Sequence, residues 1–225
     1  QEHDVLKKLA YEQLGTVGAG NHFVDIFVEE KTGDIWVANH FGSRGFGHKV
    51  ASGFLNLAKN RSFLGPNRGE SMEQAPTILS LDDERGQLYM EAMKLAGAYA
   101  YAGRDVVIDE VLDILGASAV DTIHNHHNFA WEEEHFGETF VVVRKGATPS
   151  APGQRGFIGG SMGDISVIVE GKDNDHNRSS WQSTVHGAGR IMSRTEAAGK
   201  MNWKTRRRSG GKISEQEMRK KVAAL

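Results

Sequence analysis

The sequence contains no cysteine, and this absence narrows the chemistry that is open to it. No disulfide can form within the chain and no thiolate can bind a metal, so any metal site has to use histidine, carboxylate or carbonyl ligands. The chain also lacks an apolar run of about 18 residues and a signal-peptide pattern. These two absences predict a cytoplasmic protein with no membrane partner.

The composition that remains is that of a globular protein. Charged residues make up 25% of the 225 residues and hydrophobic residues 39%, which is enough for a substantial core in one large domain or two small ones. The net charge of −2 is unevenly spread, because residues 190–225 hold eleven Lys or Arg and three Asp or Glu. A basic arm on an acidic body suits a polyanion, although a solvated helix face is the alternative interpretation.

Hydrophobic periodicity predicts a mixture of helices and hairpin strands. Helices are expected over residues 1–14, 48–59, 80–101, 104–115, 192–200 and 214–225, with Ser80 and Asp83 as a capping box for the third. Strands are expected over residues 23–29, 35–39, 119–124, 139–143 and 165–170. Because no internal repeat and no domain linker interrupts this order, the sequence predicts an α+β fold in a single domain of residues 1–225.

Four of the ten histidines lie at a predicted strand end or in a Gly-rich turn, namely His22, His40, His124 and His186. Such positions border loops, where binding and catalytic sites are usually built. A histidine there can attack an electrophile, bind a metal or move a proton. None of the four has the close spacing of a local metal motif, so a shared site needs the fold to bring them together. A purely structural histidine is the alternative at each position.

The segment from His186 to Arg194, with the sequence HGAGRIMSR, has the residues of a phosphate-binding loop. Its glycines allow backbone N–H groups to approach a ligand closely, and Arg190 and Arg194 share one face if a helix begins here. A Gly-rich turn with a surface histidine is the alternative. Ser43-Arg44 and Arg144-Lys145 are further candidates for holding the phosphates of a polymer, with plain surface charge as their alternative.

Several polar neighbours of these histidines are candidates for the same site. Asn21 precedes His22 and Asn125 follows His124, so each pair offers an amide beside a possible metal ligand. Asp25 can accept hydrogen bonds from a base edge, or it is an ordinary solvent-facing strand residue. We interpret His126, His127 and His135 as surface or supporting residues. No Walker A loop occurs, and the G-x-G near residue 18 leads into a strand, which excludes a Rossmann site.

Six motifs occur in one order along the chain, and together they resemble the RtcB family of RNA-splicing ligases. They are GxxGxGNHF (Gly15–Phe23), HxGSRGxG (His40–Gly47), HN (His124-Asn125), RKGAT (Arg144–Thr148), GSMG (Gly160–Gly163) and HGAGRxMSR (His186–Arg194). The resemblance therefore covers nearly the whole chain. It implies an RtcB-like fold of mixed sheets with surrounding helices in one catalytic domain.

The resemblance implies a reaction and its cofactors. Enzymes of this family use GTP and Mn²⁺, here two ions, to join an RNA 2′,3′-cyclic phosphate or 3′-phosphate end to a 5′-hydroxyl end in tRNA splicing or RNA repair. A histidine, matched here by His186, attacks the α-phosphate of GTP and carries the guanylate. The expected partners are therefore broken RNA ends, such as tRNA halves, together with GTP. Some family members also work with the helper protein archease, which makes archease a candidate partner.

The resemblance also assigns residues of this sequence to the site. His22, His40 and His124 match metal ligands. The guanylate-binding segments match Asn21, His22, Phe23, Val24, Asp25, His124, Asn125, Gly159, Gly160, Ser161, Met162, Ser166, His186, Gly187, Ala188 and Gly189.

The chain departs from the family pattern at four points. An upstream Asp-x-Gly-Cys-Gly segment, which supplies an Asp and a Cys ligand, and a C-terminal lysine that packs on guanine are absent. Asp25 stands where Glu is usual, and Gly159 where Pro is common. We therefore expect a catalytic core trimmed at both ends, with an incomplete two-metal site. Two alternatives keep the same scaffold without ligation: a nucleic-acid end-binding repair protein and a metal-dependent phosphohydrolase.

Overall fold

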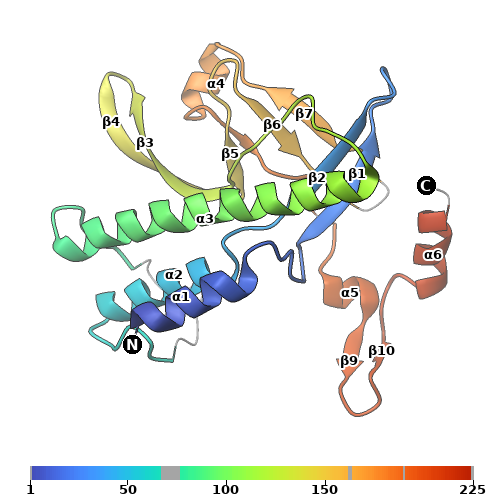
Figure 1. The fold of residues 1–225 in the computed structure, drawn as a ribbon, viewed down its shortest axis with the longest axis horizontal. Coiled ribbons are helices and arrows are strands. Elements are labelled where there is room, and N and C mark those ends of the chain that lie inside the picture. The colour runs from blue at the N-terminus through green and yellow to red at the C-terminus, as the bar shows by residue number, and fades with distance from the viewer. Residues whose placement is uncertain (1, 67–76, 162–163, 190, 224–225) are drawn as a thin grey trace. The chain divides into compact units, whose positions relative to one another are not determined.

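The computed structural model describes residues 2–66, 77–161, 164–189 and 191–223 (Figure 1). It is a mixed α+β structure, as predicted, and its described strands form five two-stranded antiparallel sheets. The chain divides into two compact units, residues 1–122 and 123–225. Among the described residues, no helix has the length and apolarity needed to cross a membrane.

The first unit packs three helices beside one hairpin. It contains α1 (Glu2–Gln13), β1 (Phe23–Val28), β2 (Ile35–His40), α2 (Arg44–Ala58) and α3 (Glu84–Leu115). Phe46, Val50 and Phe54 recur every four residues on α2, so they share one face, and they form a buried cluster with Ala96 of α3. Leu6 and Ala10 of α1 pack against the same cluster. This core holds the three helices side by side.

The long helix α3 corrects two predictions. The sequence suggested two helices with an interruption near Gly103, but α3 runs unbroken through that residue. Gly103 faces the Phe41 ring, since a Cβ there would lie 3.5 Å from it, an ordinary packing distance. The predicted capping box is also wrong. Asp83 itself occupies the N-cap without a side-chain cap, while the Ser80 hydroxyl accepts from the Asp82 N–H at 3.2 Å.

The second unit is built from short strands and helices. It contains β3 (Asn128–His135), β4 (Glu138–Lys145), β5 (Ala147–Pro149), β6 (Arg155–Ile158), β7 (Val167–Glu170), α4 (Asp175–Ser179), β8 (Ser183–Val185), α5 (Arg194–Ala198), β9 (Lys200–Asn202), β10 (Arg207–Ser209) and α6 (Glu215–Ala223). The sheets pair β3 with β4, β5 with β8, β6 with β7 and β9 with β10. Thus β8 pairs with β5, which lies more than thirty residues earlier in the chain. This pairing brings the RKGAT and HGAGRIMSR motifs together.

One strand prediction, at the boundary between the two units, fails. Residues 119–124 do not form a strand, and Val120 is fully exposed, so no neighbouring strand satisfies the backbone there. The predicted helix of residues 192–200 corresponds to the shorter α5, which begins at Arg194, and the Ser193 hydroxyl before it accepts from the Glu196 N–H at 3.1 Å. No helix begins at the glycines of HGAGRIMSR, both of which are described. Arg190 lies outside the described residues. The predicted strands of residues 139–143 and 165–170 correspond to β4 and β7.

Candidate functional site

The β5–β8 ladder places the RKGAT motif against the histidine of HGAGRIMSR. Ala147 pairs with Val185, so the next positions, Gly146 and His186, face each other at the end of the ladder. His186 Nδ1 lies 2.7 Å from the Gly146 carbonyl oxygen. A carbonyl oxygen can only accept, so Nδ1 carries the proton, and in the neutral ring the lone pair is then on Nε2. The fold therefore holds His186 in the tautomer that a nucleophile needs.

A second histidine packs against this ring. The rings of His127 and His186 have their centroids 4.4 Å apart, and the Gly146 N–H donates to the His127 carbonyl oxygen at 2.7 Å. His127, which the sequence indicates as a surface or supporting residue, is half-buried beside the predicted nucleophile. One signal for it was present in the sequence, because the His-Asn dipeptide of residues 124–125 is repeated three residues later, at residues 127–128. The structure packs the second copy against His186.

The GSMG and HGAG loops lie side by side. Gly159 and Gly187 form an isolated parallel bridge, and the Ala188 N–H donates to the Gly159 carbonyl oxygen at 3.0 Å. The Ser166 hydroxyl accepts from the Gly160 N–H at 3.0 Å. A Cβ on Gly160 would come within 2.4 Å of the Ile165 carbonyl oxygen, so only glycine fits. The structure thus joins two predicted guanylate-binding segments, although it uses the Ala188 N–H that we expected to face phosphate.

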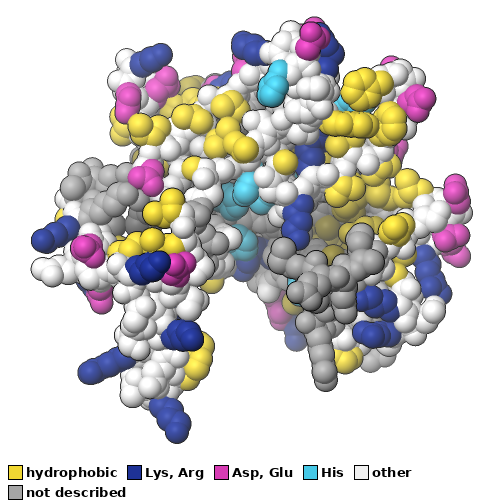
Figure 2. Space-filling model, turned by 180° about the vertical axis from the view of Figure 1, so that it is seen from behind, with side chains coloured by type: hydrophobic (Ala, Val, Ile, Leu, Met, Phe, Trp, Pro, Cys, Tyr) yellow, Lys and Arg dark blue, Asp and Glu magenta, His cyan; other side chains and the backbone are white. Residues whose placement is uncertain are grey.

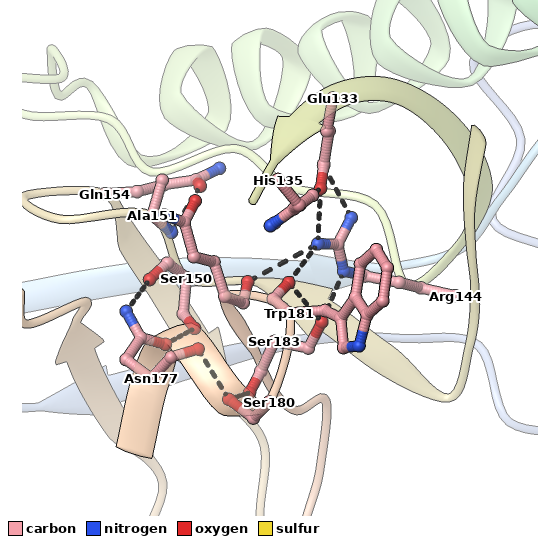
Figure 3. A network of polar contacts seen from close by, with 11 residues as sticks. Glu133, His135, Arg144, Ser150, Ala151, Gln154, Asn177, Ser180, Trp181 and Ser183 are labelled. Atoms are coloured by element: carbon pink, nitrogen blue, oxygen red, sulfur yellow. Dashed lines mark hydrogen bonds and ion pairs between the residues drawn. The ribbon is translucent and has the colours of Figure 1, made fainter. Parts of the chain in front are cut away.

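A buried ion pair supports the turn that leads into His186 (Figure 3). Arg144 on β4 is 4% exposed and makes a bidentate pair with Glu133 on β3, with distances of 2.7 and 2.8 Å. The same guanidinium donates to the Trp181 carbonyl oxygen and to the Ser183 hydroxyl, both at 2.8 Å. Trp181 has a φ of 56°, so this strained turn needs such support.

The ion pair corrects a prediction about phosphate binding. Arg144 was a candidate for holding the phosphates of a polymer, but its guanidinium is buried and bonded to protein oxygens. Its role is to fix β3, β4 and the start of β8 relative to one another. Lys145, the next residue, is exposed.

In the first unit, the β1–β2 hairpin brings two predicted metal ligands to one end. Phe23 pairs with His40 across the hairpin, and their rings stack with centroids 5.3 Å apart. His22 immediately precedes Phe23, so His22 and His40 occupy neighbouring positions at the open end. Arg44 Nη1 lies 3.2 Å from His22 Nδ1. Burial, and then the charge of Arg44, lower the pKa of His22 below its ordinary value of 6.5, which favours the neutral imidazole. Because a guanidinium can only donate, Arg44 occupies the Nδ1 lone pair of His22.

Two residues that the sequence did not reveal hold this end of β2. Arg104 on α3 is buried and donates from Nη1 to the Phe41 carbonyl oxygen at 3.0 Å. The Asn39 side-chain amide donates to the Arg104 carbonyl oxygen, also at 3.0 Å. Because Asn39 and Phe41 flank His40, α3 fixes the backbone on both sides of that histidine. Nothing in the local sequence distinguishes Arg104 from a surface arginine.

The other predicted residues are placed as follows. Asn21, Asp25, Ser161, Ala188 and Gly189 are exposed, whereas Phe23, Val24, His124, Asn125, Gly159, Gly160, Ser166 and Gly187 are half-buried. The Asn125 side chain lies over β6, 3.4 Å from where a Cβ on Gly156 would be. Met162 lies outside the described residues. Within the described part of the chain, no group of three or more His, Asp or Glu side chains could hold a metal ion. These residues therefore do not by themselves fit a complete metal centre.

Comparisons with known proteins agree with the motifs. The family model described as tRNA-splicing ligase RtcB matches residues 1–223. An RNA-splicing ligase RtcB of Escherichia coli K12 is 37% identical over 205 residues, which cover 83% of this chain and 47% of that protein. A tRNA-splicing ligase RtcB of Pyrococcus horikoshii is 32% identical over 233 residues, covering 85% and 26%. The chain thus spans about half or less of the length of these relatives.

Proposed function

The chain belongs to the tRNA-splicing ligase RtcB family, and from this membership we propose that it forms part of a GTP- and Mn²⁺-dependent RNA ligase. The proposed reaction joins a 2′,3′-cyclic phosphate or 3′-phosphate end to a 5′-hydroxyl end, in tRNA splicing or RNA repair. The observation that carries the proposal is the hydrogen bond between His186 Nδ1 and the Gly146 carbonyl oxygen. A histidine held in this tautomer has the lone pair of Nε2 for attack.

In the proposed first step, His186 Nε2 attacks the α-phosphorus of GTP. An N–P bond forms, the bond from that phosphorus to the bridging oxygen breaks, and pyrophosphate leaves with the electron pair. The Gly146 carbonyl stabilises the positive charge that develops on the ring, because it accepts the Nδ1 proton in a hydrogen bond. The guanylate then passes to the RNA 3′-phosphate, and the 5′-hydroxyl displaces GMP.

We assign the guanylate-binding role to the predicted segments around Asn21–Asp25, Asn125, Gly159–Met162 and Gly187–Gly189. His22, His40 and His124 remain the predicted Mn²⁺ ligands, and the contact of His127 with the proposed nucleophile makes it a further candidate. When bound, Mn²⁺ would neutralise charge on the phosphate oxygens. The lowered pKa of His22 favours a neutral imidazole, but Arg44 donates to its Nδ1, so this nitrogen can bind Mn²⁺ only after Arg44 moves away.

The proposal is tested by detecting a covalent guanylate adduct on His186. We expect the full-length protein, incubated with Mn²⁺ and GTP labelled at the α-phosphate, to retain an acid-labile, base-stable label. The label should be lost in His186→Ala and kept in His176→Ala, a control that removes an exposed histidine on α4 of the same unit. A label that survives His186→Ala contradicts the proposal. GTP hydrolysis without an adduct would support a phosphohydrolase, and end binding without a joined product would support a repair protein that only binds.

A further inference from the structure

The C-terminal part of the second unit carries a short hairpin of residues 200–209, which we call the basic hairpin. Lys200 pairs with Ser209 and Asn202 with Arg207 in the antiparallel β9–β10 ladder. The turn is ordered by Asn202, whose side-chain oxygen accepts from the N–H groups of residues 204 and 205 at 3.0 and 3.2 Å. The basic hairpin is therefore a folded element with a defined tip.

The base of the basic hairpin is fixed to α5. The Lys212 N–H donates to the Glu196 carbonyl oxygen at 2.9 Å, and the next N–H donates to the Ala197 carbonyl oxygen at 3.0 Å. Gly199 and Gly211 allow this close approach, because a Cβ on either would come within 2.3 or 2.5 Å of a backbone oxygen. These contacts fix the position of the basic hairpin relative to α5. In the chain, α5 directly follows the HGAGRIMS segment.

The charge on the basic hairpin is not neutralised by the protein. Its ten residues include Lys200, Lys204, Arg206, Arg207 and Arg208 and no acidic residue. The first four are exposed and have no ion-pair partner among the described residues, whereas Lys212, just beyond, pairs with Glu196 at 2.5 Å. Figure 2 shows Lys and Arg side chains projecting from both sides of the hairpin, the lowest part of that view, with no acidic side chain among them. Cations that stabilise nothing in the fold are available to an anionic partner.

An exposed indole lies among these cations. Trp203, the first residue of the turn, is 84% exposed. A fold gains nothing from leaving so large an apolar ring in water, since its burial would be worth about 2 kcal/mol or more. Base stacking on an aromatic ring beside Lys and Arg is a usual way of binding single-stranded nucleic acid. An acidic protein surface would use the cations but not the indole, and a lipid surface would need more apolar side chains than one.

We propose that the basic hairpin binds the single-stranded RNA beside the end to be joined. In this arrangement Lys204, Arg206 and Arg207 contact backbone phosphates and Trp203 stacks on an unpaired base. The inference rests on the proposed function, because the RNA is the substrate of the proposed ligase. It assigns an RNA contact to an element that lies outside the six motifs of the family resemblance. It gives the basic arm of the chain a role in holding substrate, apart from the chemistry at His186.

The first test measures the salt dependence of RNA binding. We expect the full-length Lys204→Ala/Arg207→Ala variant to bind a labelled single-stranded RNA oligonucleotide, with a 3′-phosphate, more weakly in fluorescence anisotropy. The slope of log affinity against log salt should fall by about 1.4, which corresponds to two lost phosphate contacts. The matched control, Lys7→Ala/Lys31→Ala, removes the same charge from exposed lysines of the first unit and should leave the slope unchanged.

The second test concerns stacking. Trp203→Ala should weaken binding to the same oligonucleotide about fivefold or more, and Trp203→Phe should keep most of the affinity, because a phenyl ring still stacks. Equal affinities and slopes for the hairpin variants and the lysine control overturn the inference. Loss of binding to phosphatidylserine vesicles with unchanged RNA affinity also overturns it.

A third measurement separates this inference from the proposed function. The hairpin variants should still form the GMP adduct with GTP and Mn²⁺ in the absence of RNA, because the hairpin takes no part in that step. If wild-type protein forms no adduct but the hairpin variants lose RNA binding, the ligase proposal fails and the hairpin assignment stands. If the adduct forms and RNA binding does not change in the variants, the hairpin assignment fails alone.

Discussion

His186 and Gly146 face each other at the end of the β5–β8 ladder, with Nδ1 of the imidazole 2.7 Å from the carbonyl oxygen. Gly146 has both an unusual backbone conformation and a direct contact with His186. Its φ of 70° lies in the left-handed region, and a Cβ there would lie 3.5 Å from the His186 ring. A single glycine thus turns the chain between β4 and β5 and orients the histidine.

Replacement of Gly146 by alanine should therefore disturb both stability and chemistry. We expect Gly146→Ala to lower the free energy of unfolding by about 1–2 kcal/mol through backbone strain. The rate of adduct formation should fall about tenfold, because relief of this strain moves the Gly146 carbonyl that holds the His186 ring. The matched control is Gly137→Ala, whose φ of 81° carries similar strain, while its Cβ would meet nothing within 4 Å. Equal adduct rates in the two variants would show that Gly146 does not orient His186.

The Arg144–Glu133 pair should behave as a coupled buried unit in urea unfolding. Arg144→Met leaves the Glu133 carboxylate without its bidentate partner, and we expect a loss of about 3 kcal/mol. The Arg144→Met/Glu133→Met double variant should lose clearly less than the sum of the two single changes. Arg178→Met on α4, which breaks exposed pairs with Asp173 and Asp175, should cost little. Additive effects at the buried pair would refute the coupling.

The same pair makes stability depend on pH. Burial alone would raise the pKa of Glu133, but hydrogen bonds from Arg144 and His135 outweigh it and lower the pKa below 4.5. The unfolded carboxylate therefore binds protons more readily than the folded one. The lowered pKa therefore contributes to the free energy of unfolding. This contribution is fully present at pH values above 4.5 and is lost as the pH falls through the lowered pKa of Glu133.

We expect the stability difference between wild type and Glu133→Gln to shrink as the pH is lowered from about 7 to about 3. The measurement is the free energy of unfolding at each pH. A difference that stays constant over this range would contradict the lowered pKa of Glu133.

The Arg44–His22 contact predicts a shift that NMR can detect. Burial is the larger cause of the lowered His22 pKa and the charge of Arg44 is the second, so Arg44→Met should raise the pKa without restoring 6.5. The imidazole proton shifts of His22, followed against pH, measure this directly. The control Arg61→Met removes an exposed arginine after α2 and should leave the titration of His22 unchanged. An unchanged titration in Arg44→Met would show that Arg44 does not influence it.

Local patterns were sufficient for the elements with strong periodicity. The first helix, the β1–β2 hairpin and β4 follow the alternation and helical spacing of their residues closely. The strand predicted at residues 119–124 failed because a strand needs a partner, and the fold offers Val120 none. Conversely, β3 was missed because its run of three glutamates hides the alternation, and pairing with β4 stabilises it.

The sequence by itself determined the chemical identity of the candidate site. The order of the six motifs and the exclusion of thiolate ligands within this chain follow from residue types and spacing, whereas the choice of His186 as nucleophile is a prediction from the family resemblance. Only the tertiary structure decided which residues meet. It bonds His186 to Gly146, packs His127 on the same ring and buries Arg144 against Glu133. The contact of His186 with Gly146 depends on strand pairing between segments forty residues apart, which no local pattern encodes.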